Sequence, residues 1–184
     1  MKKSLLSMVL FCCCVMLSPA YAGQGDVNIR TAPVSDLIGI GNVEVDYAIT
    51  HNFTVGPTLY RFNAEFANTN YENSLYGGRV SYYFKEALAG GWLASVTAAY
   101  GQFKVTREVG GQEFSTNTNM HVYTALFSYQ AMWDHFNITT GIGASYFSLP
   151  ETVVGYSGVD VLTINTSFMS GVVPNAEFML GWKF

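Results

Sequence analysis

The stretch Pro174–Phe184, with the sequence P-N-A-E-F-M-L-G-W-K-F, decides between the folds open to this chain. Alternate positions form one apolar face, which consists of Ala176, Phe178, Leu180, Trp182 and Phe184. The opposite face is mostly polar. A period of two predicts a β-strand between an oily and a wet environment. The oily environment is a partner sheet in a soluble sandwich, and it is lipid in an outer-membrane barrel, where the wet face lines the lumen.

The amino terminus has the three parts of a secretory signal peptide. A basic start is followed by an apolar run from Leu5 to Leu17, and Ala20-Tyr21-Ala22 is an A-x-A cleavage signal. The apolar run is too short to span a bilayer as a helix. We therefore expect a signal peptide over residues 1–22 and a single barrel domain over residues 23–184.

The composition excludes several classes of function. All three cysteines lie in the expected leader, so the mature chain has no disulfide, thiol nucleophile or cysteine metal site. A lipoprotein signal at one of them would truncate the apolar run, and we do not expect it. The formal net charge is −4 and only 12% of residues are charged, which argues against nucleic acid as a partner. No nucleotide-binding or metal-ligand motif occurs, so we expect no cofactor and no metal.

Several segments repeat the alternation of the final strand. They are Val43–Ile49, Tyr76–Phe84, Trp92–Tyr100, Tyr123–Tyr129 and Phe136–Tyr146. The segment Phe53–Phe66 is also strand-like, but its faces are less clean: Arg61 lies at a rim, or a bulge shifts the register there. An exported, aromatic-rich chain of alternating segments predicts an all-β fold, an eight-stranded antiparallel transmembrane up-and-down β-barrel.

The connections between these segments differ in length. Short ones are expected at Thr50–Asn52, Lys85–Gly91 and Trp133–His135, and longer polar ones at Ala67–Asn73, Lys104–Asn119 and Ser148–Val173. Bacterial barrels have short periplasmic turns and long extracellular loops. We expect the carboxyl terminus to be periplasmic, so the final strand runs towards the periplasm.

Two segments compete to be the eighth strand. For the long loops to lie outside, an upward strand must precede Ile38–Ile49, and Gly25–Ala32 is the candidate, followed by an outer turn at Pro33–Leu37. The alternative uses Val161–Met169 and puts the long loops in the periplasm, against the usual asymmetry.

Aromatic spacing favours lipid as the oily environment. Trp92 and Tyr100 lie eight residues apart on one face, which spans roughly 20 Å at ~3.3 Å per residue and a tilt near 40°, close to the apolar band of about 25 Å. The expected girdle residues are Tyr76, Trp92, Tyr100, Tyr123, Trp133, Tyr146, Trp182 and Phe184.

Charged residues on the inner faces predict a lumen network. Glu44, Arg79 and Glu177 lie at similar depths when counted from the periplasmic end, and Asp46 and Lys183 can pair lower down. We expect these residues to form a structural plug, because buried charges persist only when paired. The alternative is a gate in a narrow pore, which fits less well because eight-stranded interiors are normally filled.

No catalytic arrangement is visible. The only histidines are His51, His121 and His135, and none has a serine two residues away, the spacing that a shared strand face requires. We therefore expect no catalytic residue and no enzymatic activity.

The chain resembles the small outer-membrane barrels of Gram-negative bacteria, of the OmpA, OmpX and OmpW type. The resemblance rests on the leader, on the strand-turn-strand Val43–Val55 and on the ending Phe178–Phe184. The strand-turn-strand looks most like the OmpW group, and the ending looks like the signal for the barrel-assembly machinery. Members of this class are structural barrels, adhesins, narrow hydrophobic channels and, in a minority, lipid A-modifying enzymes.

The resemblance implies residence in the cell outer membrane, with outer-membrane lipid and lipopolysaccharide as neighbours and a monomeric state. We expect a non-enzymatic protein with a structural or surface-interaction role through its outer loops. The alternatives are a narrow channel for small or hydrophobic solutes, a lipid A-modifying enzyme, and a soluble lipocalin-like barrel with its apolar residues inside.

Overall fold

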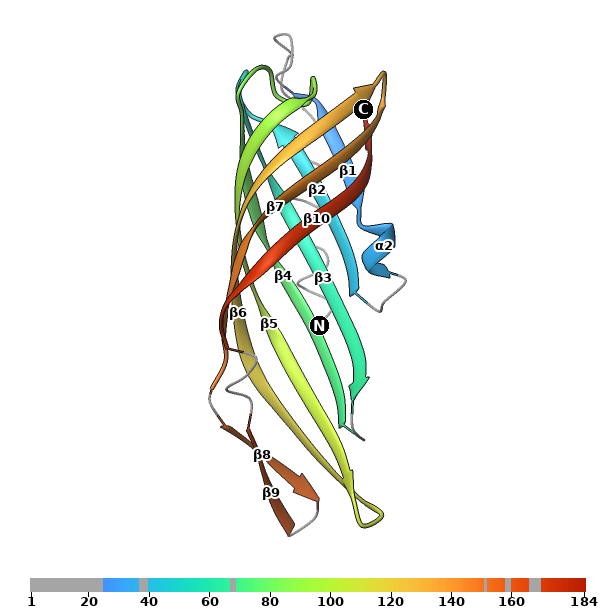
Figure 1. The fold of residues 1–184 in the computed structure, drawn as a ribbon, viewed down its shortest axis with the longest axis vertical. Helices are drawn as coiled ribbons and strands as arrows, with labels where there is room; N and C mark the ends of the chain where they lie inside the picture. Colours follow the sequence, from blue (N-terminus) through green and yellow to red (C-terminus); the bar gives the residue numbers. More distant parts are fainter. Residues whose placement is uncertain (1–24, 37–39, 67–68, 151, 158–159, 166–169) are drawn as a thin grey trace.

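A computed structural model describes residues 25–36, 40–66, 69–150, 152–157, 160–165 and 170–184. The expected signal peptide, residues 1–22, lies outside the described residues. Strands dominate the rest of the chain, and they form one sheet (Figure 1). Their bounds are β1 Val27–Thr31, β2 Ile40–Ala48, β3 Phe53–Phe66, β4 Thr69–Tyr83, β5 Gly91–Val109, β6 Gln112–Trp133, β7 Phe136–Ser148, β8 Thr152–Ser157, β9 Asp160–Asn165 and β10 Gly171–Lys183.

Eight of these strands close into an antiparallel ring. Each of β1 to β6 pairs with the next strand, β7 pairs with β10, and β10 returns to β1. At the seam, Ile29 is the register partner of Trp182, and the Phe184 amide donates to the Val27 carbonyl at 2.8 Å. The eighth ring strand is therefore β1, within the predicted Gly25–Ala32. The competing segment contributes β9, which pairs with β8 outside the ring.

The side chains of the ring alternate as the sequence predicts, with the apolar set on the outer wall. Trp92, Val96, Phe127 and Ile142 are between 47% and 72% exposed. The neighbouring positions that face the lumen, such as Thr97, are buried although they are polar. This distribution is the reverse of a water-soluble fold, in which the apolar side chains are buried.

Two expected loops are wrong. The segments Ala67–Asn73 and Lys104–Asn119 largely continue the neighbouring strands, so β3 and β4 run to Phe66 and from Thr69, and β5 and β6 meet in a turn at Gly110-Gly111. In Lys104–Asn119, two valines and three threonines favour a strand, and every residue except Gly110 and Gly111 has a cross-strand partner. These segments are polar because of what surrounds the sheet there, and their polarity does not mean that the sheet has ended.

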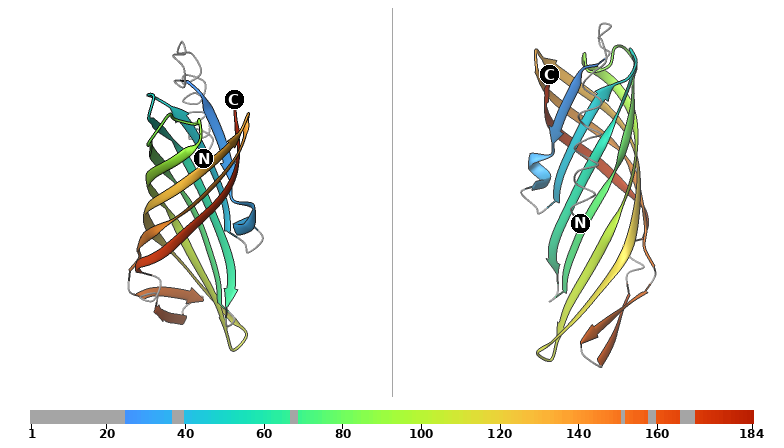
Figure 2. Two further views of the ribbon diagram at one scale, coloured as in Figure 1. Left: turned by 45° about the horizontal axis from the view of Figure 1, so that its top comes forward. Right: turned by 180° about the vertical axis from the view of Figure 1, so that it is seen from behind.

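The first outer connection also differs from expectation. Instead of a simple turn at Pro33–Leu37, the one-turn helix α2, Pro33–Asp36, lies outside the wall beside β1 and β2 (Figure 2). Because β1 has only five residues, the part of β10 before Leu180 has β7 as its only strand partner among the described residues. Pro174 lies in this part, and its missing N–H suits a strand edge.

The strand ends define two unlike poles. The short turns and the carboxyl terminus gather at one end of the molecule, and the β5–β6 turn and the β8–β9 hairpin lie at the other (Figure 1). The expected connection at Ser148–Val173 contains that hairpin, which touches the ring at the pair Ser115 and Tyr156.

Candidate functional site: the filled lumen

The centre of the lumen holds a cluster of charged side chains. The Arg79 guanidinium on β4 lies between two carboxylates, with Nη1 2.9 Å from Glu44 Oε2 and 2.9 Å from Glu177 Oε2. Its Nη2 also donates to Glu177 Oε1 at 3.2 Å. Glu44 comes from β2 and Glu177 from β10, so the three strands are linked across the lumen. The structure thus brings together the three residues that depth counting placed at one level.

Arg30 is a member of this cluster that the sequence reasoning did not include. Its Nη2 lies 3.0 Å from Glu44 Oε2 and 2.8 Å from Asp46 Oδ2, and its side chain is fully buried. Its Nη1 donates to the Thr139 hydroxyl at 3.3 Å. A signal was present, because Arg30 lies in the candidate first strand, Gly25–Ala32, where alternation puts it on the face opposite Val27 and Ile29. Its register partner there is Glu44.

Neutral side chains complete the coordination of the carboxylates. The Ser128 hydroxyl donates to Glu177 Oε1, and the Tyr60 hydroxyl donates to Glu44 Oε1 at 3.3 Å. Glu44 and Glu177 therefore have both cationic and neutral donors, whereas Asp46 has the ion pair with Arg30. Buried charges persist under these conditions, since an ion pair taken out of water is costly unless hydrogen bonds satisfy it.

The lumen is closed at the short-turn end by an apolar cluster of buried residues: Ala48, Tyr83, Ala87, Leu88 and Leu93. Leu88 is fully buried and has φ 58°, a left-handed conformation that is uncommon for leucine. The Ala87 amide donates to the His51 carbonyl at 2.7 Å, which joins this turn to the one between β2 and β3. The connection Lys85–Gly91 therefore seals this end of the barrel.

A second apolar cluster fills the lumen on the other side of the charged residues. Its buried members are Leu75, Ala99, Phe103, Val105, Met120, Val122 and Leu149, with Tyr60, Tyr71 and Phe147 packed against them. The sequence reasoning missed it, because Phe103 lies beyond the predicted strand Trp92–Tyr100 and Val105 lies in the expected loop Lys104–Asn119. The lumen is thus apolar, charged and apolar again along its axis.

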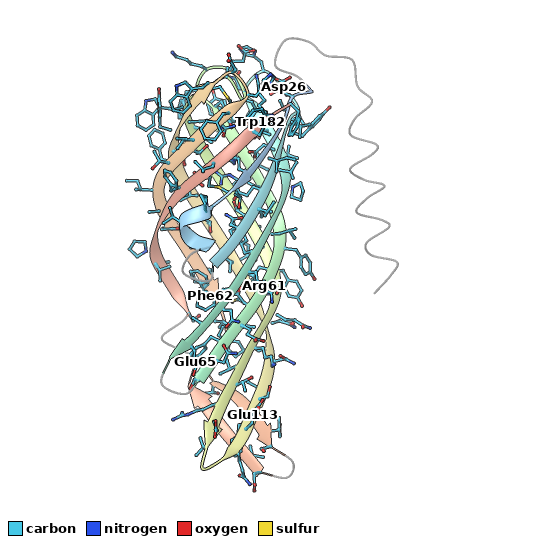
Figure 3. The ribbon with its side chains drawn as sticks, turned by 90° about the vertical axis from the view of Figure 1, so that its right-hand side faces the viewer. Asp26, Arg61, Phe62, Glu65, Glu113 and Trp182 are labelled. Carbon is cyan, nitrogen blue, oxygen red and sulfur yellow. The ribbon has the colours of Figure 1, made fainter. Side chains whose placement is uncertain are left out.

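The expected pair between Asp46 and Lys183 does not form. Asp46 pairs with Arg30, while Lys183 Nζ lies 3.2 Å from Asp26 Oδ2 near the short-turn end. Asp26 is labelled in Figure 3, close to Trp182. Depth from one end of the barrel gives the level of a side chain, but it does not give its position around the ring.

The eight expected girdle residues lie on the outer wall. Seven of them are between 45% and 66% exposed, and Tyr100 is half-buried against the Tyr76 ring, 5.9 Å away centroid to centroid. Trp92 stacks on Phe127 at 5.0 Å, and Tyr123 stacks on Tyr146 at 6.5 Å.

The histidines have simple surroundings. His135 Nδ1 lies 2.8 Å from the Lys183 carbonyl and its ring stacks on Trp182, while His121 packs on Tyr100. Within the described part of the chain, no histidine hydrogen-bonds to a hydroxyl side chain. No group of three or more potential metal-ligating side chains occurs among those residues either.

No family model and no curated protein matches this sequence. Comparison with solved structures finds a crystal structure of Neisserial surface protein A, with a TM-score of 0.43 and 12% identity, over 86% of this chain and 92% of that chain. None of the helical residues that the structure describes forms a helix long and apolar enough to cross a membrane. We therefore argue function from the residues of this chain alone.

Proposed function

We propose that this chain is an integral protein of the bacterial outer membrane that has no enzymatic activity and serves a structural or surface-interaction role. The observation that carries the proposal is the inverted distribution of side chains, with charges inside and large apolar residues over the outer wall. In water such a wall would expose far more contiguous apolar surface than soluble proteins tolerate. In lipid the same wall is solvated, and the closed ring leaves few backbone groups unpaired.

The dimensions support a membrane band that covers only part of the barrel. β5 has 19 residues, which is roughly 45–50 Å along the membrane normal at ~3.3 Å per residue and a tilt near 40°. The apolar band of such barrels is about 25 Å tall. We therefore place the outer parts of β5 and β6 outside the membrane, together with the β8–β9 hairpin. This part of the chain would make the surface interactions.

The layered lumen supports a plug more than a pore. Arg79 and Arg30 are almost fully buried, and apolar clusters close the lumen on both sides of them. An ion would have to cross two layers of apolar side chains, and these layers already fill the barrel interior. The charged layer then stabilises the ring from within.

The leader, the ending Phe178–Phe184 and the strand-turn-strand Val43–Val55 support further parts of the proposal. We infer export with cleavage after residue 22, insertion by the barrel-assembly machinery and a monomeric state in lipid. Kinship with the OmpW group belongs to this proposal as well.

Heat-modifiable migration tests membrane residence. Outer-membrane fractions are run on a denaturing gel with and without boiling, and we expect the unboiled protein to migrate faster as an intact barrel. Recovery of the protein from the periplasm without detergent would overturn the proposal.

Two measurements separate this role from the other candidates. In planar bilayers, we expect neither the refolded protein nor Glu177→Gln to give a steady conductance, and channel activity in either would contradict the plug. After overexpression, we expect unchanged lipid A by mass spectrometry, and a changed acylation pattern would contradict a non-enzymatic role.

A further inference from the structure

Arg61 is a feature of the described outer wall that a structural barrel leaves unexplained. Its side chain is exposed on β3, on the same face as Leu59, and no described residue forms an ion pair or hydrogen bond with it. A cation on a lipid-facing wall is most unfavourable at the bilayer midplane, and its cost becomes small near the interfaces. Its position along the strand therefore matters.

The register places Arg61 just beyond the outer aromatic residues. Leu59 is the cross-strand partner of Tyr76, and Arg61 is two residues further from the short-turn end, about 5 Å along the membrane normal at ~3.3 Å per residue. Tyrosine rings of a girdle lie at the headgroup level. Arg61 consequently reaches the layer where the phosphates of outer-leaflet lipids lie. Figure 3 shows its place on β3, between Trp182 and Glu113.

Among the described residues, the neighbours of Arg61 leave its charge uncompensated. Its cross-strand partners are Gly41 on β2 and Ser74 on β4, which are uncharged. The closest acidic residue along the outer face of β4, Glu72, forms an exposed pair with Lys104 at 3.6 Å. An anion from the surroundings is therefore the available partner for Arg61.

A groove of about 360 Å³ runs along the wall beside Arg61, over β1 to β4. Its outward residues are Thr31, Gly41, Val43, Leu59, Ser74 and Tyr76, with Arg61 among them. Gly41 has no side chain, which hollows the wall next to the arginine. The groove thus presents an apolar floor and one cation, and it suits a molecule with an acyl chain and an anionic head.

A second groove on the outer wall gives a useful contrast. It measures about 510 Å³ and is lined by Phe53, Val80, Val96, Phe127 and Ile142 among others, without a charged residue. It lies nearer the middle of the apolar band, where lipid chains alone are expected. Of these two grooves, the one beside Arg61 combines the apolar floor with a headgroup partner.

We propose that the groove beside Arg61 is a binding site for an outer-leaflet glycolipid, with a phosphate monoester on the Arg61 guanidinium and an acyl chain over Leu59 and Val43. Guanidinium suits this partner because its N–H groups bind phosphate oxygens two at a time. The proposal rests on the proposed membrane residence and adds to it a lipid class and a site.

Native mass spectrometry of the detergent-purified protein tests the site. The probes are bisphosphorylated lipid A, the same lipid after enzymatic dephosphorylation, and phosphatidylglycerol, whose phosphate is a diester. The variants are Arg61→Gln, Gly41→Leu, which fills the groove, and Arg107→Gln, which removes another exposed cation without a described partner. Heat-modifiable migration confirms that each variant is folded.

We expect the native protein to retain one lipid A molecule at concentrations where neither other lipid is retained. Arg61→Gln and Gly41→Leu should each reduce retention about tenfold or more, the range of a charge-assisted hydrogen bond, and Arg107→Gln should not. Equal retention by Arg61→Gln, or equal binding of dephosphorylated lipid A or phosphatidylglycerol, would overturn the site but leave the barrel proposal intact. A native protein that is not heat-modifiable would instead overturn both.

Discussion

Arg79 and Glu177 are 98 residues apart in the chain, yet their side chains meet in the lumen with Nη1 2.9 Å from Oε2. β4 and β10 are not neighbours in the ring, since β3, β2 and β1 lie between them. The contact therefore braces the barrel across its lumen, and Glu44 joins it from β2. Removal of the contact between Arg79 and Glu177 tests whether the charged layer stabilises the ring.

Arg79→Met should destabilise the barrel strongly, because it leaves Glu44 and Glu177 buried without their shared cation. Breaking a buried pair from one side costs about 3–5 kcal/mol. Urea titration of the lipid-refolded protein, followed by the heat-modifiable gel shift, measures the loss. The matched control is Lys104→Met, whose partner Glu72 is 41% exposed, and whose loss should cost about 1 kcal/mol or less. Equal midpoints for the two variants would contradict a bracing role.

The second prediction is that Glu177→Gln partly rescues Arg79→Met. Arg79→Met leaves Glu177 without a cation, while Glu44 keeps Arg30. The double variant also removes the Glu177 charge, so its destabilisation should be smaller than the sum of the two single effects. The coupling energy should fall at about 0.5–3 kcal/mol, the range for residues in one network. The same cycle with Arg79→Met and Glu72→Gln should be additive, because Glu72 lies on the outer wall. Additivity in the first cycle would mean that Arg79 and Glu177 act independently.

The charged layer also shows what the sequence could predict. Alternation assigned the inner face, and counting from the short turns gave a common level to Glu44, Arg79 and Glu177. The partner of Asp46 was beyond this reasoning, because two residues at one level can lie on opposite sides of the ring. The register of β1, in which Arg30 lies opposite Glu44, determines where these side chains lie around the ring. Hydrophobic periodicity carries no information about this register.

The outer ends of β5 and β6 were not predicted, for a different reason. Where both faces of a strand contact water, or where the interior is partly polar, the sequence no longer alternates between apolar and polar residues, and the strand cannot be recognised by its period. Between Lys104 and Asn119 the polar residues therefore suggested a loop, although Val105 and Phe114 are buried on one face of the sheet. Residue type, in particular the threonines and valines, was the better guide there.

The third prediction concerns the close approach of β4 and β5. A methyl group added at Gly77 would overlap the backbone carbonyl of Ala98, whereas one added at Gly78 would find its nearest neighbour, the Gly56 carbonyl oxygen, at 3.8 Å. Gly77→Ala should therefore lower the urea midpoint or prevent refolding, and Gly78→Ala should leave the midpoint nearly unchanged. The two variants make the same chemical change at adjacent positions, so any difference reports the packing. Similar behaviour of both would show that β4 and β5 can separate at no cost.

The last prediction concerns the outermost part of the wall. The β8–β9 hairpin pairs with the ring through one register pair, Ser115 with Tyr156. We expect a variant that joins Val105 to Thr116 through Asn-Gly, a two-residue turn that suits a hairpin, to remain heat-modifiable, because Val105 and Thr116 are already partners. The shortened sheet lacks Ser115, so residues 152–165 should be cleaved faster by proteinase K added to intact cells, with the full-length chain as control. Unchanged cleavage would mean that other contacts hold the hairpin. Loss of heat modifiability would mean that the barrel needs the outer ends of β5 and β6 in order to fold.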